Sequence, residues 1–272
     1  MALAHGLSYR GSMEPALARH LAACNNAVLP GERLRLVLGG QEVGWITPGT
    51  VPILAACSPL ECRDGHAYLP IETDLDAVGR TLAHAGLCRF RDEPFDVWPD
   101  AGGCALGRMD RGAMPVLGLL AVGAHLNGLV RRAGELFLWV GRRAKNRPLD
   151  PGKLDHLVAG GVPSGLTPAQ TLIKEAGEEA GIPPKLAARA VKVAELTYAM
   201  QRPEGLRRDR LVCFDLELPE DFQPRPADGE AEGFELWPIA QVLERVRTSD
   251  DFKFNVNLVL INLLTRLGLV AA

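Results

Sequence analysis

The sequence lacks a surplus of charge of either sign. Its 30 Lys and Arg residues nearly balance 33 Asp and Glu residues, and the formal net charge at pH 7 is -3. A nucleic-acid-binding domain or a protein drawn to an anionic membrane would carry a basic excess. We therefore expect no nucleic acid and no membrane among the partners, and an anionic ligand would have its charge met by local groups.

Several catalytic motifs are also missing. The glycines at 160, 161 and 165 do not follow the spacing of a dinucleotide-binding loop, and no Gly-Lys-Ser/Thr phosphate loop occurs. No Gly-x-Ser-x-Gly element marks a serine nucleophile, and Ser164 has no convincing histidine partner. These absences disfavour nicotinamide chemistry, phosphate-loop NTP hydrolysis and acyl transfer.

Cysteine and long apolar runs are sparse. The six cysteines show no metal-type pairing, which favours reduced, mostly buried thiols of a cytoplasmic protein. Residues 1–10 contain no apolar core long enough for a signal peptide. The apolar segment 256–272 is interrupted by Asn257, Asn262 and Arg266 and is short for a membrane span, so it predicts a core helix.

The most informative stretch, residues 160–182, is a glycine-rich turn followed by an acidic helix. Thr167 suits the N-cap and Pro168 suits the first helical position, so the helix is predicted to begin there. Gly181 predicts its end.

Three carboxylates on this helix, those of Glu175, Glu178 and Glu179, are spaced three and four residues apart and share one side. Each like-charge pair costs roughly 0.2 to 0.5 kcal/mol, and the last helical turn favours cations instead. Gly177 costs about 1 kcal/mol relative to Ala. Clustered carboxylate oxygens are ligands of hard divalent cations, so a metal site and an acidic solvated helix end both remain open on spacing alone.

The same stretch resembles the signature of the Nudix, or MutT-like, hydrolases. The matching positions are Gly160, Glu175, Glu178, Glu179, Gly181 and Ile182. The departures are Leu166 for a glutamate, Lys174 for an arginine and Ala176 for a larger aliphatic residue. The resemblance implies that the three helix glutamates bind Mg²⁺ or Mn²⁺. It also implies that the departures affect efficiency and substrate class more than the metal.

A narrower resemblance extends over nearly the whole chain. Residues 151–161, the Lys-Glu and Glu-Glu-Ala parts of the helix, residues 228–234 and residues 252–268 are similar to one Nudix subfamily. Its members include the Nudix part of fungal thiamine pyrophosphokinase, plant plastid Nudix proteins and bacterial stand-alone versions. They carry an extra N-terminal domain of uncharacterised role, and Leu166 and Lys174 are usual variants among them.

The predicted fold is α+β. A Nudix α/β/α sandwich with a mixed sheet, residues 113–272, would follow a small α+β accessory domain, residues 1–112. The glycine-rich loop 100–112 is the expected boundary. Residues 33–46 predict a hairpin with a Gly-Gly turn. Further strands are predicted at 122–131, 136–143, 154–158, 191–200, 211–218 and 230–236, with a charged loop at 202–210 and helices at 239–247 and 252–268.

The glycine turn and the helix provide the predicted catalytic residues. Gly160 and Gly161 would let the backbone pass close to the reacting groups, and Lys174 would order the carboxylates. One glutamate would act as base, with Glu175 favoured and Glu178 also a candidate, but the sequence does not separate base from ligand.

Substrate contacts are predicted on either side of the helix. Arg143 and Lys145, in a basic run that precedes the glycine turn, could neutralise a diphosphate, although such runs are usually solvated loops. In the Nudix family a further acidic residue approaches the metal from the region after the helix. This makes Glu230 and Glu232 candidates, with a plain surface role equally open.

These observations predict a divalent-metal-dependent pyrophosphohydrolase that cleaves a small-molecule diphosphate. The subfamily resemblance suggests thiamine diphosphate, or its oxidised or damaged analogues, cut to the monophosphate. Alternatives are a nucleotide-sugar or dinucleotide pyrophosphatase and, from a different class, a ligand-binding Nudix module with weak or lost catalysis. Whether two chains pair as a homodimer is left open.

Overall fold

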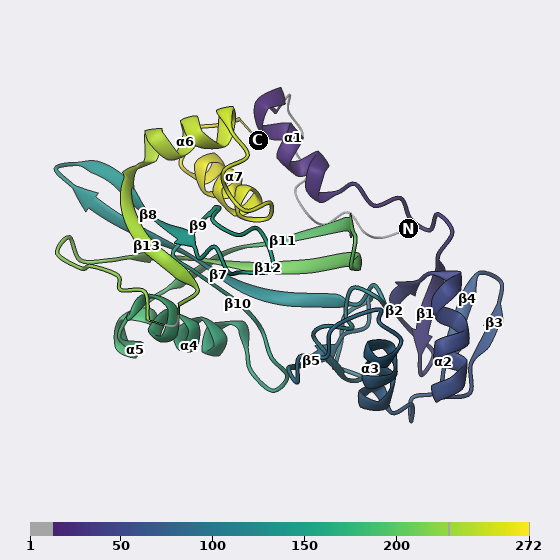
Figure 1. The fold of residues 1–272 in the computed structure, drawn as a ribbon. Coiled ribbons are helices and arrows are strands. Elements are labelled where there is room, and N and C mark those ends of the chain that lie inside the picture. Colours follow the sequence, from purple (N-terminus) through teal and green to yellow (C-terminus); the bar gives the residue numbers. More distant parts are fainter. Residues whose placement is uncertain (1–12, 228, 272) are drawn as a thin grey trace.

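The computed structural model describes residues 13–227 and 229–271. The expectations for residues 1–10 and for position 228 lie outside this part of the chain. Within it, the strands form a seven-stranded sheet, a four-stranded sheet and a two-stranded ribbon. The two larger sheets lie at opposite ends of the molecule (Figure 1).

The smaller end is built on the sheet β2-β1-β4-β3. Gly39 and Gly40 connect its first two strands with φ of 56° and 81°, the left-handed conformation that a tight hairpin turn requires. The predicted hairpin is confirmed. The elements of this end are β1 (Leu34–Leu38), β2 (Gln41–Ile46), η1 (Pro48–Thr50), α2 (Val51–Cys57), β3 (Glu61–Arg63), β4 (His66–Leu69), α3 (Leu75–His84), β5 (Pro94–Val97) and β6 (Gly107–Asp110).

The large sheet follows the path β11-β12-β7-β8-β13, with β10 paired to β7 and β9 paired to β8. It is mixed, because β7 runs parallel to β12 and antiparallel to β8. Its strands are β7 (Leu120–Arg132), β8 (Glu135–Arg143), β9 (Leu154–Asp155), β10 (Val158–Gly161), β11 (Val191–Arg202), β12 (Gly205–Glu217) and β13 (Ala231–Pro238).

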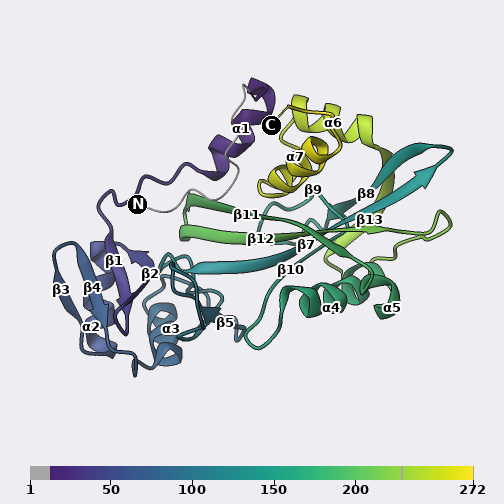
Figure 2. The ribbon, with the colours of Figure 1, turned by 180° about the vertical axis from the view of Figure 1, so that it is seen from behind.

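Helices cover both faces of the large sheet (Figures 1 and 2). One face carries α4 (Pro168–Ala180) and α5 (Pro184–Ala187), and the other carries α6 (Ile239–Thr248) and α7 (Val256–Arg266). Leu172 of α4 shares a buried cluster with Ala124 and Leu126 of β7, which closes the core on the α4 side. The predicted α/β/α sandwich is confirmed.

Helix α7 lies in the protein interior. Val259, Leu260 and Ile261 are all fully buried, which confirms the predicted core helix. No helix within residues 13–227 and 229–271 combines the length and the apolar character needed to cross a membrane.

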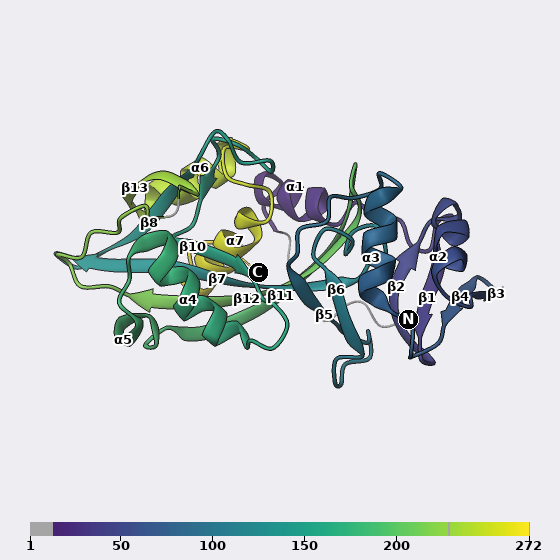
Figure 3. The same cartoon turned by 60° about the horizontal axis from the view of Figure 1, so that its bottom comes forward.

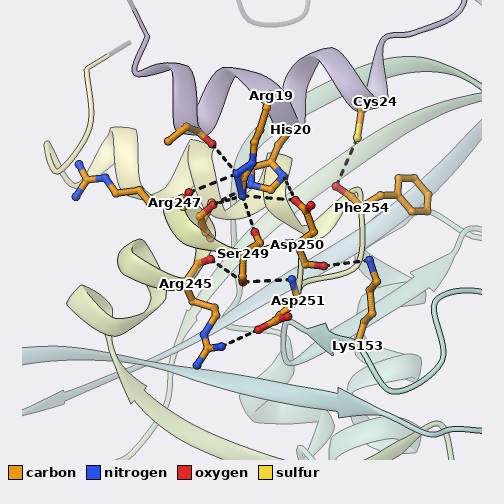
Figure 4. A network of polar contacts seen from close by, with 12 residues as sticks. Arg19, His20, Cys24, Lys153, Arg245, Arg247, Ser249, Asp250, Asp251 and Phe254 are labelled. Atoms are coloured by element: carbon orange, nitrogen blue, oxygen red, sulfur yellow. Dashed lines mark hydrogen bonds and ion pairs between the residues drawn. The ribbon is translucent and has the colours of Figure 1, made fainter.

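The first helix, α1 (Pro15–Cys24), packs on the large end of the molecule although it precedes the small sheet in sequence. Arg19 Nη2 donates to the Ser249 carbonyl at 2.6 Å, and His20 Nε2 lies 2.8 Å from the Val246 carbonyl (Figure 4). Leu17 is fully buried in a cluster with residues of α6 and α7. The α1 side chains therefore satisfy carbonyls at the C-terminal end of α6, which intrahelical bonds leave open.

The two ends of the molecule are joined by a buried polar junction. Arg208 of β12 places Nη2 2.8 Å from Asp100 Oδ1, and Arg35 of β1 pairs with the same carboxylate. The main chain contributes a 2.9 Å bond from Trp45 N to the Leu117 carbonyl. Figure 3 shows β7 and β12 extending toward the small end, where these contacts are made.

Three local predictions were wrong in part. The expected loop 202–210 is strand except for residues 203–204, because β11 and β12 continue almost to the turn. The expected loop 100–112 contains β6. The expected strand 154–158 is two short strands, β9 and β10, which pair with different neighbours.

Candidate active site

Helix α4 begins and ends where its sequence predicts. The Thr167 hydroxyl accepts a bond from Gln170 N, and the Gln170 side chain accepts from Thr167 N, so a complete capping box fixes the start. Gly181 ends the helix with φ of 65°. This fixes the rotation of the helix and therefore the direction of its glutamates.

Glu175 lies against the glycine that opens the turn. A Cβ atom built on Gly160 would be 2.4 Å from Glu175 Cγ and 2.7 Å from its carboxylate carbon. Only glycine permits this approach. Burial raises the pKa of Glu175, and the nearby Lys174 charge opposes that shift.

Glu179 is bound by the neighbouring backbone group. Its Oε2 accepts a 3.1 Å hydrogen bond from Ala159 N, one residue before Gly160. Burial raises the pKa of Glu179 well above its ordinary value, and the carboxylates of Glu230 and Asp155 add to the shift. The Ala159 bond only partly offsets these effects. Two of the three predicted ligands thus converge on consecutive residues of β10.

Glu178 contacts a lysine of its own helix and not strand β10. Its Oε2 lies 2.6 Å from Lys174 Nζ, whose distance to Glu175 Oε1 is 3.5 Å, and about half of the Glu178 side chain is exposed. The Glu178 hydrogen bond is the main cause of the raised pKa of Lys174. Lys174 therefore contacts two of the three carboxylates.

A pocket lies between β8, β9, β13 and the end of α4, and it brings together Arg143, Glu179 and Glu230. Lys145 is exposed, and Glu232 is exposed on β13; neither is among the described residues that line the pocket. Glu230 Oε1 forms a 2.8 Å ion pair with Arg147.

Arg143 is held in place at this pocket. Its Nη1 lies 2.7 Å from Asp155 Oδ2, and its Nη2 donates to the Leu149 carbonyl at 3.0 Å. Lys253 Nζ approaches the same carboxylate at 3.8 Å. Burial alone would raise the pKa of Asp155, but Lys253 and the hydrogen bond with His156 outweigh it and hold that pKa well below the usual range.

Two buried histidines continue this network. His156 Nδ1 lies 2.9 Å from Asp155 Oδ1, and His156 Nε2 lies 2.9 Å from His125 Nδ1. Sequence reasoning assigned no role to Asp155, His156 or Lys253. The run Lys-Leu-Asp-His at 153–156 was the available signal, but only the fold brings Lys253 to it.

The donor set suits a divalent cation in chemistry and charge. Glu175 and Glu179 offer hard oxygens, and both have raised pKa values that a bound cation would relieve. The arrangement is not preformed, however. Among the described residues, no three His, Cys, Asp or Glu side chains stand together as a metal-holding group.

A protein-family model described as the NUDIX domain matches residues 121–256. The chain belongs to the Nudix family. It is 38% identical over 252 residues to Nudix hydrolase 24, chloroplastic, of Arabidopsis thaliana, covering 88% of this chain and 69% of the relative. It is 42% identical over 181 residues to Nudix hydrolase 20, chloroplastic, of the same plant, covering 66% of this chain and 48% of the relative.

Solved structures are similar to parts of this Nudix chain. DR0079 from Deinococcus radiodurans gives a TM-score of 0.48 at 22% identity, covering 62% of this chain and 98% of that one. The NUDIX domain of Shewanella oneidensis NrtR, solved with ADP ribose, gives a TM-score of 0.43 at 15% identity, covering 54% of this chain and 87% of that one. The assignment to the Nudix family rests on the sequence matches.

Family membership defines the general chemistry. The chain is a Nudix hydrolase that acts on phosphorus-containing anhydrides, with a pyrophosphohydrolase kind of activity. Nudix hydrolases generally use divalent metal ions. The plant relatives also confirm the predicted likeness to plastid Nudix proteins, whereas the likeness to thiamine pyrophosphokinase remains a prediction.

Proposed function

We propose that this Nudix hydrolase cleaves the diphosphate of thiamine diphosphate, or of its oxidised or damaged analogues, to the monophosphate, with Mg²⁺ or Mn²⁺. The observation that carries the chemistry is the convergence of two glutamates on β10. Glu175 packs on Gly160, and Glu179 is bound by Ala159 N. The substrate rests on the subfamily resemblance. The proposed location is the cytoplasm, in keeping with six free cysteines.

Glu175, Glu178 and Glu179 would hold the cation. When bound, it would neutralise diphosphate oxygens and lower the pKa of the attacking water. Glu178 would exchange its 2.6 Å ion pair with Lys174 for the cation. Gly160 keeps the backbone close enough for Glu175 to stay in place.

The remaining residues position the substrate and move a proton. Glu175 is the favoured base, because its burial raises its pKa toward the range in which a carboxylate accepts a proton from water. Arg143, held by Asp155, would meet substrate charge from the pocket wall. Lys145 and Glu232 would contribute only if substrate extends beyond the pocket, whereas Glu230 already lines it.

Two alternatives have different support. A nucleotide-sugar or dinucleotide pyrophosphatase would use the same carboxylates. A binding module with weak catalysis is the alternative that Leu166 suggests, because the Nudix signature has a glutamate at that position.

Turnover distinguishes these functions. We would measure hydrolysis with Mg²⁺ or Mn²⁺ on thiamine diphosphate, its oxo and oxy analogues, ADP-ribose and a dinucleoside polyphosphate. Glu178→Gln and Glu179→Gln should abolish it, and Glu244→Gln, which alters an exposed residue of α6, should not. Preference for the thiamine compounds supports the proposal. Activity confined to the nucleotides refutes the substrate, and metal binding without any turnover favours the binding module.

A further inference from the structure

Strand β5, from the small end of the molecule, is hydrogen-bonded to the glycine turn of the Nudix motif. Ser164 N donates to the Pro94 carbonyl at 2.8 Å. The Ser164 hydroxyl donates to Asp96 Oδ1 at 2.5 Å. The turn that leads from Gly161 to helix α4 is therefore hydrogen-bonded to a strand about seventy residues earlier in the chain.

An aromatic contact fixes the same strand against the turn. A Cβ atom on Gly161 would be 2.5 Å from Phe95 Cζ, so the Phe95 ring rests directly on the glycine backbone. Phe95 is 4% exposed and packs in one apolar cluster with Val97 and Met109. The ring thus couples the turn to the core of the small end.

The conformation of this turn determines the position of Glu175, and contacts with β5 stabilise it. It connects Gly160 with α4, and so it sets how Glu175 meets Gly160. Position 166, where the Nudix signature has a glutamate, is a leucine with 36% exposure. A leucine side chain offers no hydrogen bond to the turn.

The small end can serve as a fixed support. Its junction with the large sheet includes the buried Arg208–Asp100 pair at 2.8 Å and the Trp45–Leu117 main-chain bond at 2.9 Å. Buried charged bonds of this kind are costly to open. A strand attached to this junction can therefore hold the turn in one position.

We propose that Asp96 is a positioning residue of the active site: through Ser164 it holds the glycine turn so that Glu175 and Glu179 stay aligned for the cation. The N-terminal part of the chain thereby becomes a structural component of the Nudix site. The inference rests on the proposed function, because the aligned carboxylates are those assigned to metal binding.

A double-mutant cycle tests this in the full-length protein. Asp96→Ala, Ser164→Ala and the double variant would be compared by hydrogen–deuterium exchange of residues 162–167 without metal and by Mn²⁺ titration calorimetry. Asp96→Asn keeps an acceptor oxygen for the Ser164 hydroxyl and serves as the conservative variant. Asp76→Asn removes an exposed carboxylate of the same end and serves as the control.

We expect each alanine variant to exchange faster in this segment and to bind Mn²⁺ about tenfold more weakly. The double variant should be no worse than either single one, because both break the same contact. Asp96→Asn and Asp76→Asn should behave as wild type. Alanine variants with wild-type exchange and Mn²⁺ affinity would overturn the inference. Failure of the proposed metal site looks different, since the wild type itself would then bind no Mn²⁺; that result would overturn the positioning role too.

Discussion

Gly160 and Glu175 are in direct contact, with room for no more than a hydrogen atom between the glycine Cα and the glutamate side chain. A methyl group on Gly160 would approach Glu175 Cγ to 2.4 Å. The first glycine and the first retained glutamate of the Nudix motif thus fix one another across the β10–α4 boundary.

Gly160→Ala should displace Glu175 and lower kcat by about 100-fold, the effect of moving a reacting group by about 1 Å. The control is Gly49→Ala, where a Cβ would meet nothing within 4 Å. Steady-state kinetics and near-ultraviolet circular dichroism would separate lost chemistry from lost folding. Full activity of folded Gly160→Ala protein would show that Glu175 need not lie there.

Gly177→Ala should stabilise the protein by about 0.5 to 1 kcal/mol, because alanine loses less backbone entropy in a helix. Gly177 lies inside α4, and a Cβ there would meet only the Ile182 carbonyl, at 3.8 Å. Urea unfolding measures the difference. A loss of stability would contradict the open space seen beside this glycine.

Asp155→Asn should destabilise the protein by about 3 to 5 kcal/mol, because it leaves buried cations without their counter-charge. The Asp155 side chain is 11% exposed and pairs with Arg143 at 2.7 Å. Glu61→Gln breaks the exposed Glu61–Arg63 pair and should change stability by less than about 1 kcal/mol. Equal effects of the two variants in urea unfolding would rule out a special role for the Asp155 network.

The contribution of neutral His125 to stability should be lost as the pH drops below about 6.5. Burial lowers the pKa of His125 well below its ordinary value of 6.5, and the His156 charge adds to the shift. Below pH 6.5 the unfolded chain binds a proton at this histidine and the folded chain does not. The stabilisation from neutral His125 is therefore fully present above pH 6.5 and is lost as the pH falls toward the pKa of the folded state. Melting temperatures from pH 7.5 to 5 should fall less steeply in His125→Gln, while exposed His84→Gln should follow the wild type.

Local signals predicted much of the fold. The Gly39–Gly40 turn and the Thr167 cap specify their structures through neighbouring residues alone. The prediction of a loop at 202–210 was wrong because charged residues usually indicate exposure to solvent. Arg208 is instead 3% exposed, and its partner Asp100 lies over a hundred residues away. Long-range pairing of this kind leaves no trace in local spacing.

The candidate site also combines features that the sequence predicts with features that only the fold shows. The spacing of Glu175, Glu178 and Glu179 could be read directly, whereas their different surroundings could not. Ala159 binds Glu179 only because β10 lies beside α4, and Asp96 reaches Ser164 only because the two ends of the molecule are joined. The sequence therefore indicates the candidate groups, and only the fold shows which residues contact each of them.

Helix α1 means that the catalytic half of the molecule is not one continuous length of chain. A fragment starting at residue 113 would leave the Leu17 site between α6 and α7 open to water, along with the carbonyls that Arg19 and His20 satisfy. Such a fragment would expose an apolar groove and tend to self-associate. A cut after residue 27 would instead keep the small end in place, and a peptide of residues 13–27 added in trans would fill the groove, so the protein is suited to being split there into two pieces that reassemble.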